Sequence, residues 1–418
     1  MPLPWSEVCD PSDGYTPRWS GTEEFIEDIT YRIWEKGDRE FIKETYSDTC
    51  PVIALSGNCE GADTILKNTT DLLEQFPDRT LYPCDILWNG NNTAGYHSSQ
   101  LISTKCTYHH TNSAGSQYSW ASHLKQARIW VIVHRVVKDG VILREWVVSD
   151  NKSLYQQLRV NQEEVATRCA EKWLKDKLDP EKSEFCHLSW LAAEFQRVQN
   201  TGSIGGDIRL NLQNITPAQR PMYQYLGQRV AKIYHRAWGP EGMGSRGKFE
   251  ELVKLLYHPH ARFESPQTNS TDCTGWTELT CLYDTFILGG QQGKEVIMTL
   301  DWVIIKPGHD RRKILTNGAT PNAWRYPYPE DVNLQMELES KFANSDQVSE
   351  SFTMSIRWCL VGYQKQENPD ILVPLVLLAE SHLDCVGFRV IRDITVYDRV
   401  AVDAQVKLTT EVVHNVQF

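Results

Sequence analysis

Three side chains that can carry protons, His134, Glu145 and Asp150, occur within one short stretch of the 418-residue sequence. An enzyme that removes a proton beside a carbonyl needs a base with a pKa near neutrality and a hydrogen-bond donor for the enolate that forms. Both groups must lie in a pocket that excludes water, because burial displaces their pKa values. The three residues are therefore candidates for general acid–base catalysis.

Which of these side chains share a face depends on the turn at Asp139-Gly140, a strong hairpin signal between two strands. A two-residue turn places His134 directly opposite Glu145. A three-residue turn with a bulge instead places His134 on the same side as Asp150. Asp150 could also serve only as the cap of a helix that begins near Lys152. The sequence leaves these alternatives open.

A second group of candidates lies on the strand around Tyr96 and His97, where polar residues are frequent. Polar side chains in a central strand need partners, which a polar pocket supplies; the alternative is a strand with one wet face. In the pocket interpretation, Tyr96 or His97 donates to the enolate. The 14 Trp and 17 Tyr of the chain fit an aromatic-lined cavity. The side chains predicted to contact the substrate are Trp130, Trp146, Tyr108 and His109.

The elements that must position these residues are helices followed by strands. Apolar residues recur every three to four positions from Thr22 to Tyr46, which predicts amphipathic helix. Another helix is predicted near Ala62 to Phe76. Strands are predicted in succession at Leu81–Trp88, Tyr96–Tyr108, Ala127–Val137 and Val141–Ser149. Helices followed by an antiparallel meander predict an α+β fold, in which a curved sheet wraps around helices and encloses a space.

The second half of the sequence repeats features of the first. Tyr257-His258-Pro259 matches Tyr46-Ser47-Asp48, and Cys273-Thr-Gly matches Cys59-Glu-Gly. Further on, Glu380–Leu383 matches Ala121–Leu124 at an offset of 259 residues. This offset sets Asp393 against His134 and leaves the Glu145-Trp146 pair without a counterpart, which predicts a degenerate second copy.

These repeats divide the chain into three parts. We predict a domain at residues 20–160, a helical linker at 161–221 and a second, divergent domain at 222–418. Residues from about 306 to 351 have no counterpart in the first half and are predicted to be an insertion, a candidate lid.

The composition excludes several classes of function. With 43 Lys and Arg against 54 Asp and Glu, the formal net charge is -11 and no basic cluster occurs, which argues against nucleic-acid binding. No run of 18 apolar residues predicts a membrane span. The 11 cysteines include no Cys-x-x-Cys pair, and no signal sequence is evident, so we predict reduced thiols and a cytoplasmic location.

A metal site is the weaker alternative. His258, His260 and Glu264 could share a strand face at two-residue spacing. Pro259 interrupts this strand, and a third clear ligand is lacking. We therefore predict no metal and no organic cofactor.

The stretch from Ile132 to Asn151 resembles the closing hairpin of SnoaL-like polyketide cyclases of the nuclear transport factor 2 superfamily. The shared pattern is a strand, an Asp-Gly turn, a Glu-Trp pair and an Asp that ends the strand. The following Leu154-Tyr-Gln-Gln-Leu is similar to the family's terminal Leu-x-x-Gln-Leu helix, and Tyr31–Trp34 with Tyr46 resembles its first two helices. The resemblance covers about residues 20–160, and residues 222–418 only through the internal repeat.

The resemblance implies two tandem cone-shaped barrels, each a curved antiparallel sheet around N-terminal helices with one pocket. It also implies a cofactor-independent isomerase, cyclase or lyase that acts on a hydrophobic, oxygenated small molecule, with His134 and Asp150 facing one cavity. The alternative is a non-catalytic small-molecule-binding or dimerisation module, because fold alone does not settle function. Sheet faces in this superfamily often pair, which allows a homodimer.

Overall fold

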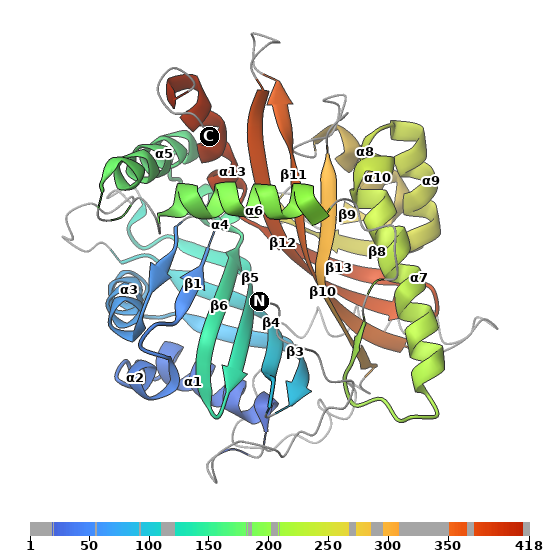
Figure 1. Ribbon diagram of the computed structural model, residues 1–418, viewed down its shortest axis with the longest axis horizontal. Helices are drawn as coiled ribbons and strands as arrows, with labels where there is room; N and C mark the ends of the chain where they lie inside the picture. Colours follow the sequence, from blue (N-terminus) through green and yellow to red (C-terminus); the bar gives the residue numbers. More distant parts are fainter. Residues whose placement is uncertain are drawn as a thin grey trace.

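The chain folds into an α+β protein with two open, curved sheets, as its computed structural model shows (Figure 1). The predicted class is confirmed, but the sheets are mixed and not purely antiparallel, because short edge strands pair in parallel. The residues that the structure describes are 19, 21–54, 57–91, 93–109, 122–180, 182, 186–201, 208, 210–266, 273–285, 296–308, 351–365 and 372–412.

The first sheet has six strands in the order β2-β1-β6-β5-β4-β3. Its four long strands pair antiparallel in chain order and agree with the predicted ones: β3 (Thr80–Asn91), β4 (Gly95–Thr107), β5 (Gln126–Lys138) and β6 (Val141–Ser149). The short strand β1 (Pro51–Ile53) runs parallel to β6, and β2 (Cys59–Glu60) pairs with β1.

Three helices pack on one face of this sheet: α1 (Thr22–Trp34), α2 (Phe41–Thr45) and α3 (Ala62–Gln75). The apolar stripe of α1, which includes Phe25, Ile29 and Ile33, is buried to 2 % exposure or less. This stripe packs on Trp88 and Tyr96 of the sheet. The amphipathic spacing therefore forms the helix that the sequence predicts, and burial of its apolar face stabilises it.

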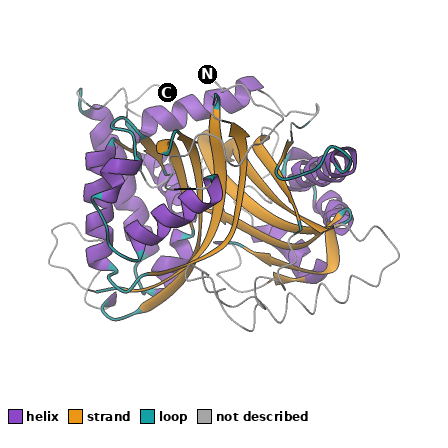
Figure 2. Ribbon diagram, turned by 90° about the horizontal axis from the view of Figure 1, so that it is seen from below, coloured by secondary structure: helices purple, strands orange, loops and turns teal. Residues whose placement is uncertain are grey.

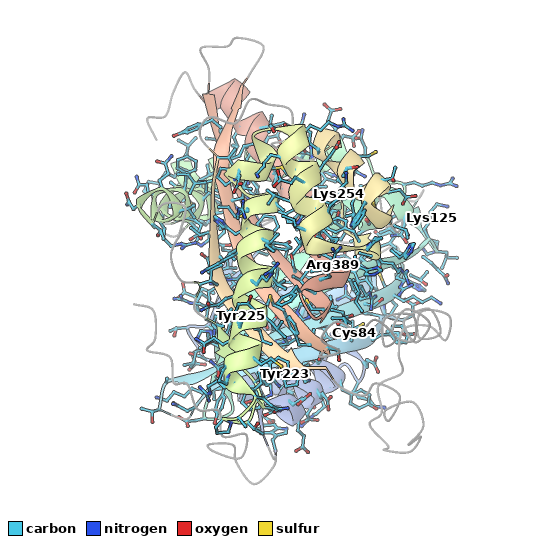
Figure 3. The ribbon with its side chains drawn as sticks, turned by 90° about the vertical axis from the view of Figure 1, so that its right-hand side faces the viewer. Cys84, Lys125, Tyr223, Tyr225, Lys254 and Arg389 are labelled. Atoms are coloured by element: carbon cyan, nitrogen blue, oxygen red, sulfur yellow. The ribbon has the colours of Figure 1, made fainter. Side chains whose placement is uncertain are left out.

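The second sheet has the order β7-β10-β11-β12-β13-β8-β9. Its strands are β7 (Asn211–Leu212), β8 (Tyr257–Glu264), β9 (Cys273–Thr274), β10 (Ile297–Pro307), β11 (Ser351–Lys365), β12 (Leu372–Val386) and β13 (Arg389–Tyr397). Helices α7 (Arg220–Trp238), α8 (Pro240–Met243), α9 (Arg246–Leu256) and α10 (Gly275–Thr285) pack on it. Figure 3 shows α7 in front of the sheet, where Tyr223 is buried and Tyr225 is 58 % exposed.

Read from β2 to β3 and from β9 to β10, the two sheets have the same strand order. Strand pairing identifies residues in equivalent positions. Tyr46 stands beside Ile142 and Tyr257 beside Val390, as the sequence match of the two tyrosines predicts. Val390 follows Ile142 by 248 residues, so the expected offset of 259 is wrong for this hairpin. A four-residue match is too short to fix the register across loops of different length.

The corrected register changes two correspondences. His382, and not Asp393, takes the place of His134, because each histidine stands opposite a serine of the preceding strand. Asp393-Ile394 takes the place of Glu145-Trp146, so the acidic position has a counterpart after all.

The two sheets pack face to face (Figure 2), with α1 to α3 on the far face of the first sheet and α7 to α10 on the far face of the second. Trp130, Ile132 and Val148 of the first sheet form one buried cluster with Ile394 and Val396 of the second. This contact is possible because strand side chains alternate, so each sheet has one face for its own helices and one for the other sheet.

Two helices connect the halves within the predicted linker, α5 (Gln162–Leu178) and α6 (His187–Thr201). Ala170 and Trp173 of α5 are buried in a core shared with Ala401 and Ala404 of the last helix, α13 (Arg399–Val412). Residues 309–350 of the predicted insertion lie outside the described residues. In the described part, no helix is long and apolar enough to cross a membrane.

One prediction concerns two equivalent glycines before α3 and within the first turn of α10. Gly61 (φ 85°) and Gly275 (φ 75°) have left-handed backbones, and a Cβ would lie 2.8 Å from the Asp48 carbonyl oxygen and 2.7 Å from that of Pro259. Replacement of either by Ala should lower the free energy of unfolding by about 1–3 kcal/mol, measured by chemical denaturation.

The control is Gly247→Ala in α9, where a Cβ meets nothing within 4 Å. This variant should gain about 0.5–1 kcal/mol. Equal effects at all three positions would contradict the steric explanation.

Candidate functional site

A cavity of about 530 Å³ lies inside the first half, between its sheet and α3, α4 (Asn151–Gln157) and α5. Its wall is mostly apolar and comes from alternate residues of β3 to β6: Leu81, Ile102, Ile129, Val131, Val133 and Val147. An apolar cavity of this volume with few polar groups is typical of a small-molecule site.

The polar part of the wall is a buried network centred on Arg135 and Glu145. Arg135 Nε donates to Glu145 Oε2 at 2.9 Å, and Tyr46 Oη donates to the same oxygen at 2.9 Å. Arg135 Nη1 also donates to Gln100 Oε1 at 2.9 Å, and the Thr30 hydroxyl to the same atom at 3.1 Å. Arg135 and Glu145 line the cavity, so a guanidinium and a carboxyl group belong to the surface that a bound molecule would meet.

Burial keeps the phenol of this network protonated. It raises the pKa of Tyr46 well above its usual value, and the negative charge of Glu145 raises it further, although Arg135 opposes this. A protonated phenol can only donate to the carboxylate. Tyr46 therefore fixes the orientation of Glu145 from behind the cavity wall.

The hairpin explains why Arg135 and not His134 meets Glu145. Its turn has two residues, Asp139-Gly140, both with positive φ, as a type I′ turn requires. A bulge in β6 makes Leu143 an extra residue, and the shifted pairing brings Arg135 opposite Glu145. The turn therefore has two residues, as in the first predicted alternative. His134 nevertheless points to the same side as Trp146, as in the second.

His134 and His97 lie in the layer between the two sheets, outside the cavity wall. Their ring centroids are 4.4 Å and 4.1 Å from that of Trp302 in β10. His134 Nδ1 also lies 3.7 Å from Glu380 Oε1 of β12. Both histidines therefore join the halves.

Glu380 is the centre of this layer. Its Oε1 accepts hydrogen bonds from the hydroxyls of Ser99 and Ser355, the second at 3.0 Å. The two serines, which occupy equivalent positions in β4 and β11, lie 2.9 Å apart. Ser99 Oγ also lies 2.8 Å from His382 Nε2. All four side chains are buried.

Burial and charge determine the protonation of this layer. Burial lowers the pKa of His134, although the neighbouring Glu380 opposes this, and burial lowers the pKa of His97 well below its usual value. Burial opposes ionisation of Glu380, but the neighbouring imidazoles of His134 and His382 and the hydroxyl of Ser99 lower its pKa to about 2. A single carboxylate is therefore held between the sheets by hydroxyls and imidazoles.

Asp150 is a helix cap, which was the second interpretation of this residue. Its Oδ1 accepts from Ser153 N at 3.0 Å and its Oδ2 from the Ser153 hydroxyl at 2.5 Å, at the start of α4. Burial raises the pKa of Asp150 to about 6. Asp398 caps α13 through Ala401 N in the same way. The expectation that His134 and Asp150 face one cavity is therefore not met.

The remaining predicted residues lie outside the cavity wall. Tyr96 packs edge-on against Trp88 in the core beneath α1. Trp130 Nε1 donates to Glu264 Oε2 at 2.8 Å, across the contact between the sheets. Trp146, also on that side, lies beneath the Arg357 guanidinium, with 4.2 Å between its centre and the ring centroid.

Tyr108 and His109 follow β4 at its far end. Tyr108 is fully buried against Phe76, with 5.7 Å between the ring centroids. The ring of His109 lies 6.2 Å from that of His123. Of the predicted site residues, Glu145 is the one that lines the cavity.

Sequence reasoning missed Arg135, Gln100 and the role of Tyr46. Arg135 follows His134 in the strand, so the two side chains point to opposite faces of the sheet. This alternation identifies Arg135 as a cavity residue only when it is known which face lines the cavity. Tyr46 was recognised as part of the repeat, but its hydrogen bond to Glu145 joins residues 99 positions apart.

The predicted metal alternative does not form. The ring centroids of His258 and His260 are 5.7 Å apart. The carboxylate of Glu264, the third ligand of this alternative, accepts a hydrogen bond from Trp130. Among the described residues, no group of three His, Cys, Asp or Glu side chains is placed to hold a metal ion.

In the described part of the second half, the corresponding region holds large buried side chains. Asp393, at the Glu145 position, accepts hydrogen bonds from Tyr257 at 2.5 Å and Thr395 at 2.7 Å. Trp238 and Trp358, both buried, pack in this core. Burial raises the pKa of Asp393 to about 7, although the two hydrogen bonds oppose this.

Comparisons with known proteins found similar solved structures. No protein-family profile matches the chain, and no curated protein matches it. IdmH from Streptomyces antibioticus, a candidate polyketide cyclase, is 20 % identical, with a TM-score of 0.27 over 33 % of this chain and 98 % of its own.

Two further matches are of the same kind. A candidate polyketide cyclase from Bacillus cereus is 22 % identical over 36 % of this chain and 92 % of its own, with a TM-score of 0.26. AclR from Streptomyces galilaeus, a candidate hydroxylase, is 17 % identical over 32 % of this chain and 93 % of its own, with a TM-score of 0.27. The matched structures thus cover about a third of the chain.

The buried Glu380 predicts acid sensitivity of the contact between the sheets. Because its pKa falls from 4.5 in the unfolded chain to about 2, its contribution is present above pH 4.5 and is lost as pH falls towards 2. Glu380→Gln should lower the free energy of unfolding at pH 7 by about 2 kcal/mol and flatten its dependence on pH below 4.5. Glu250→Gln on the surface of α9 is the control. If the unfolding free energy of Glu380→Gln falls below pH 4.5 as steeply as that of the unmodified protein, Glu380 is not the cause of the acid sensitivity.

For Asp393 we expect the opposite pH dependence of the unfolding free energy. Its pKa rises from 3.8 to about 7, so the folded state retains a proton that the unfolded chain releases, and this contribution is lost as pH rises through 7. In Asp393→Asn, the slope of the unfolding free energy against pH should change between pH 4 and 7. The change should be up to about 1.4 kcal/mol per pH unit, which corresponds to one proton. Denaturant titrations at several pH values test this, and parallel curves for both proteins would exclude it.

Proposed function

We propose that the first half is a cofactor-independent isomerase, cyclase or lyase that acts on an oxygenated hydrophobic small molecule. The observation that carries this proposal is the Arg135–Glu145 pair in the wall of a mostly apolar cavity. A carboxylate can take a proton beside a carbonyl, and a guanidinium can stabilise the enolate oxygen. The SnoaL-like pattern of the Asp139-Gly140 hairpin supports the same class of reaction.

In this scheme each polar group has one task. Glu145 removes the proton and returns it to another carbon or to a leaving group. Arg135 binds the carbonyl oxygen, whose negative charge grows in the transition state. The same negative charge competes with Glu145 for Arg135, which weakens the Arg135–Glu145 ion pair and frees Glu145 to act as a base. Tyr46 and Gln100 are positioning residues, because they hold Glu145 and Arg135 through hydrogen bonds.

We further propose that the two halves are divergent copies of one unit, with a first SnoaL-like domain at 20–160, a linker at 161–221 and a second domain at 222–418. The shared strand order and the equivalent glycines Gly61 and Gly275 support this proposal. The large buried side chains around Asp393 support a bracing role for the second copy.

A binding module without catalysis is the second candidate. The observation that favours it is the direct ion pair, because Arg135 competes with a substrate proton for Glu145. Both candidates predict a ligand in the cavity, and only the first predicts exchange of a proton on carbon.

The test is hydrogen–deuterium exchange at carbon beside a carbonyl. A panel of polyketide, terpenoid and aromatic carbonyl compounds is screened by thermal shift, and the compounds that bind are incubated with the protein in D2O and followed by NMR. Glu145→Gln should slow exchange by about 10²–10⁴-fold. Asp393→Asn, the matched carboxylate of the second half, should not.

Full exchange in Glu145→Gln would refute the enzyme proposal. Binding without exchange in the unmodified protein would favour the binding module.

A further inference from the structure

The wall of the first cavity carries an excess of positive charge. Its basic side chains are Arg79, Arg135, Arg168 and Lys172, whereas Glu145 is its one acidic side chain among the described residues. The chain as a whole has the opposite balance, with a net charge of -11. Arg135 and Glu145 pair with each other, and the wall carries three further basic side chains.

Two of these groups come from the linker helix α5. Arg168 and Lys172 are one turn apart, and Val165 and Cys169 of the same face also line the cavity. Both cations are exposed, whereas Arg135 and Glu145 are buried. A molecule in the cavity therefore meets the ion pair at its inner end and the two cations of α5 near solvent.

The position of α5 is fixed by the second half. Its opposite face buries Trp173 and Ala170 against Ala404 of α13, and Lys407 of α13 lies 3.1 Å from Glu163. The cations are consequently presented by an anchored helix, so its backbone does not have to be ordered when they bind a ligand.

Arg79 adds a third positive group on the wall. Its guanidinium centre lies 5.1 Å from the ring centroid of Trp34, which also lines the cavity.

We propose that the ligand of this cavity is an amphipathic acid, with an apolar body against the strands and a carboxylate or similar anionic group bound by Arg168 and Lys172. The inference rests on the proposed function for the site and names its substrate class. The apolar wall selects the body, and the basic groups select the charge, because a cavity with low-dielectric walls concentrates the field of the charges that line it. A neutral compound of the same shape lacks the second interaction.

The experiment compares two fluorescent probes of similar shape, anionic 8-anilinonaphthalene-1-sulfonate and neutral N-phenyl-1-naphthylamine, titrated into the full chain. The anionic probe should bind at least tenfold more tightly. Arg168→Gln/Lys172→Gln should weaken the anionic probe about tenfold and leave the neutral probe unchanged. Arg246→Gln/Lys254→Gln, which removes two exposed cations from α9, should change neither.

Val133→Trp fills the cavity and should abolish binding of both probes, which assigns the signal to this site. Equal affinities for the two probes in the unmodified protein, anionic binding that survives Val133→Trp, or absence of binding would each overturn the inference. If both probes bind equally and Val133→Trp abolishes this binding, the inference fails but the proposed enzyme still stands. The role of Glu145 and the deuterium-exchange test do not depend on the charge of the ligand.

Discussion

Burial of one carboxylate between two sheets is the constraint on which the rest of the structure depends. Glu380 is fully buried, so hydroxyl and imidazole groups from both halves must converge on it. Ser99 and His134 meet this requirement from the first sheet and Ser355 from the second. Such a centre fixes how the sheets are placed, because apolar contacts alone tolerate sliding and this polar contact does not.

The alternation of side chains along each strand then separates two functions. In β5, Trp130, Ile132 and His134 face the other sheet, whereas Val131, Val133 and Arg135 face the cavity. The homodimer considered from the sequence would use the face that the second half of the same chain already covers. One chain therefore contains the sheet-to-sheet contact that separate subunits could otherwise supply.

The sequence predicted what depends on local pattern and missed what depends on distant pairing. The helix at Thr22–Trp34, the four long strands and the Asp139-Gly140 turn follow from periodicity and turn chemistry, and the structure contains them. The exchange of His134 for Arg135 in the site follows from one extra residue, Leu143, which carries no sequence signal of its own. The position of His134 opposite Glu380 could not be predicted, because it joins residues 246 positions apart in sheets whose relative placement no local rule determines.

The placement of α5 has a thermodynamic consequence for the whole chain. One side of this helix closes the cavity of the first half, and the other side belongs to a core completed by α13 at the end of the second half. Loosening of α13 would expose Trp173 and release the cavity wall, so the two halves share part of their unfolding free energy. By linkage, any molecule that binds against α5 stabilises the C-terminal helix as well, although the two do not touch. The cavity and the far end of the chain therefore belong to one cooperative unit.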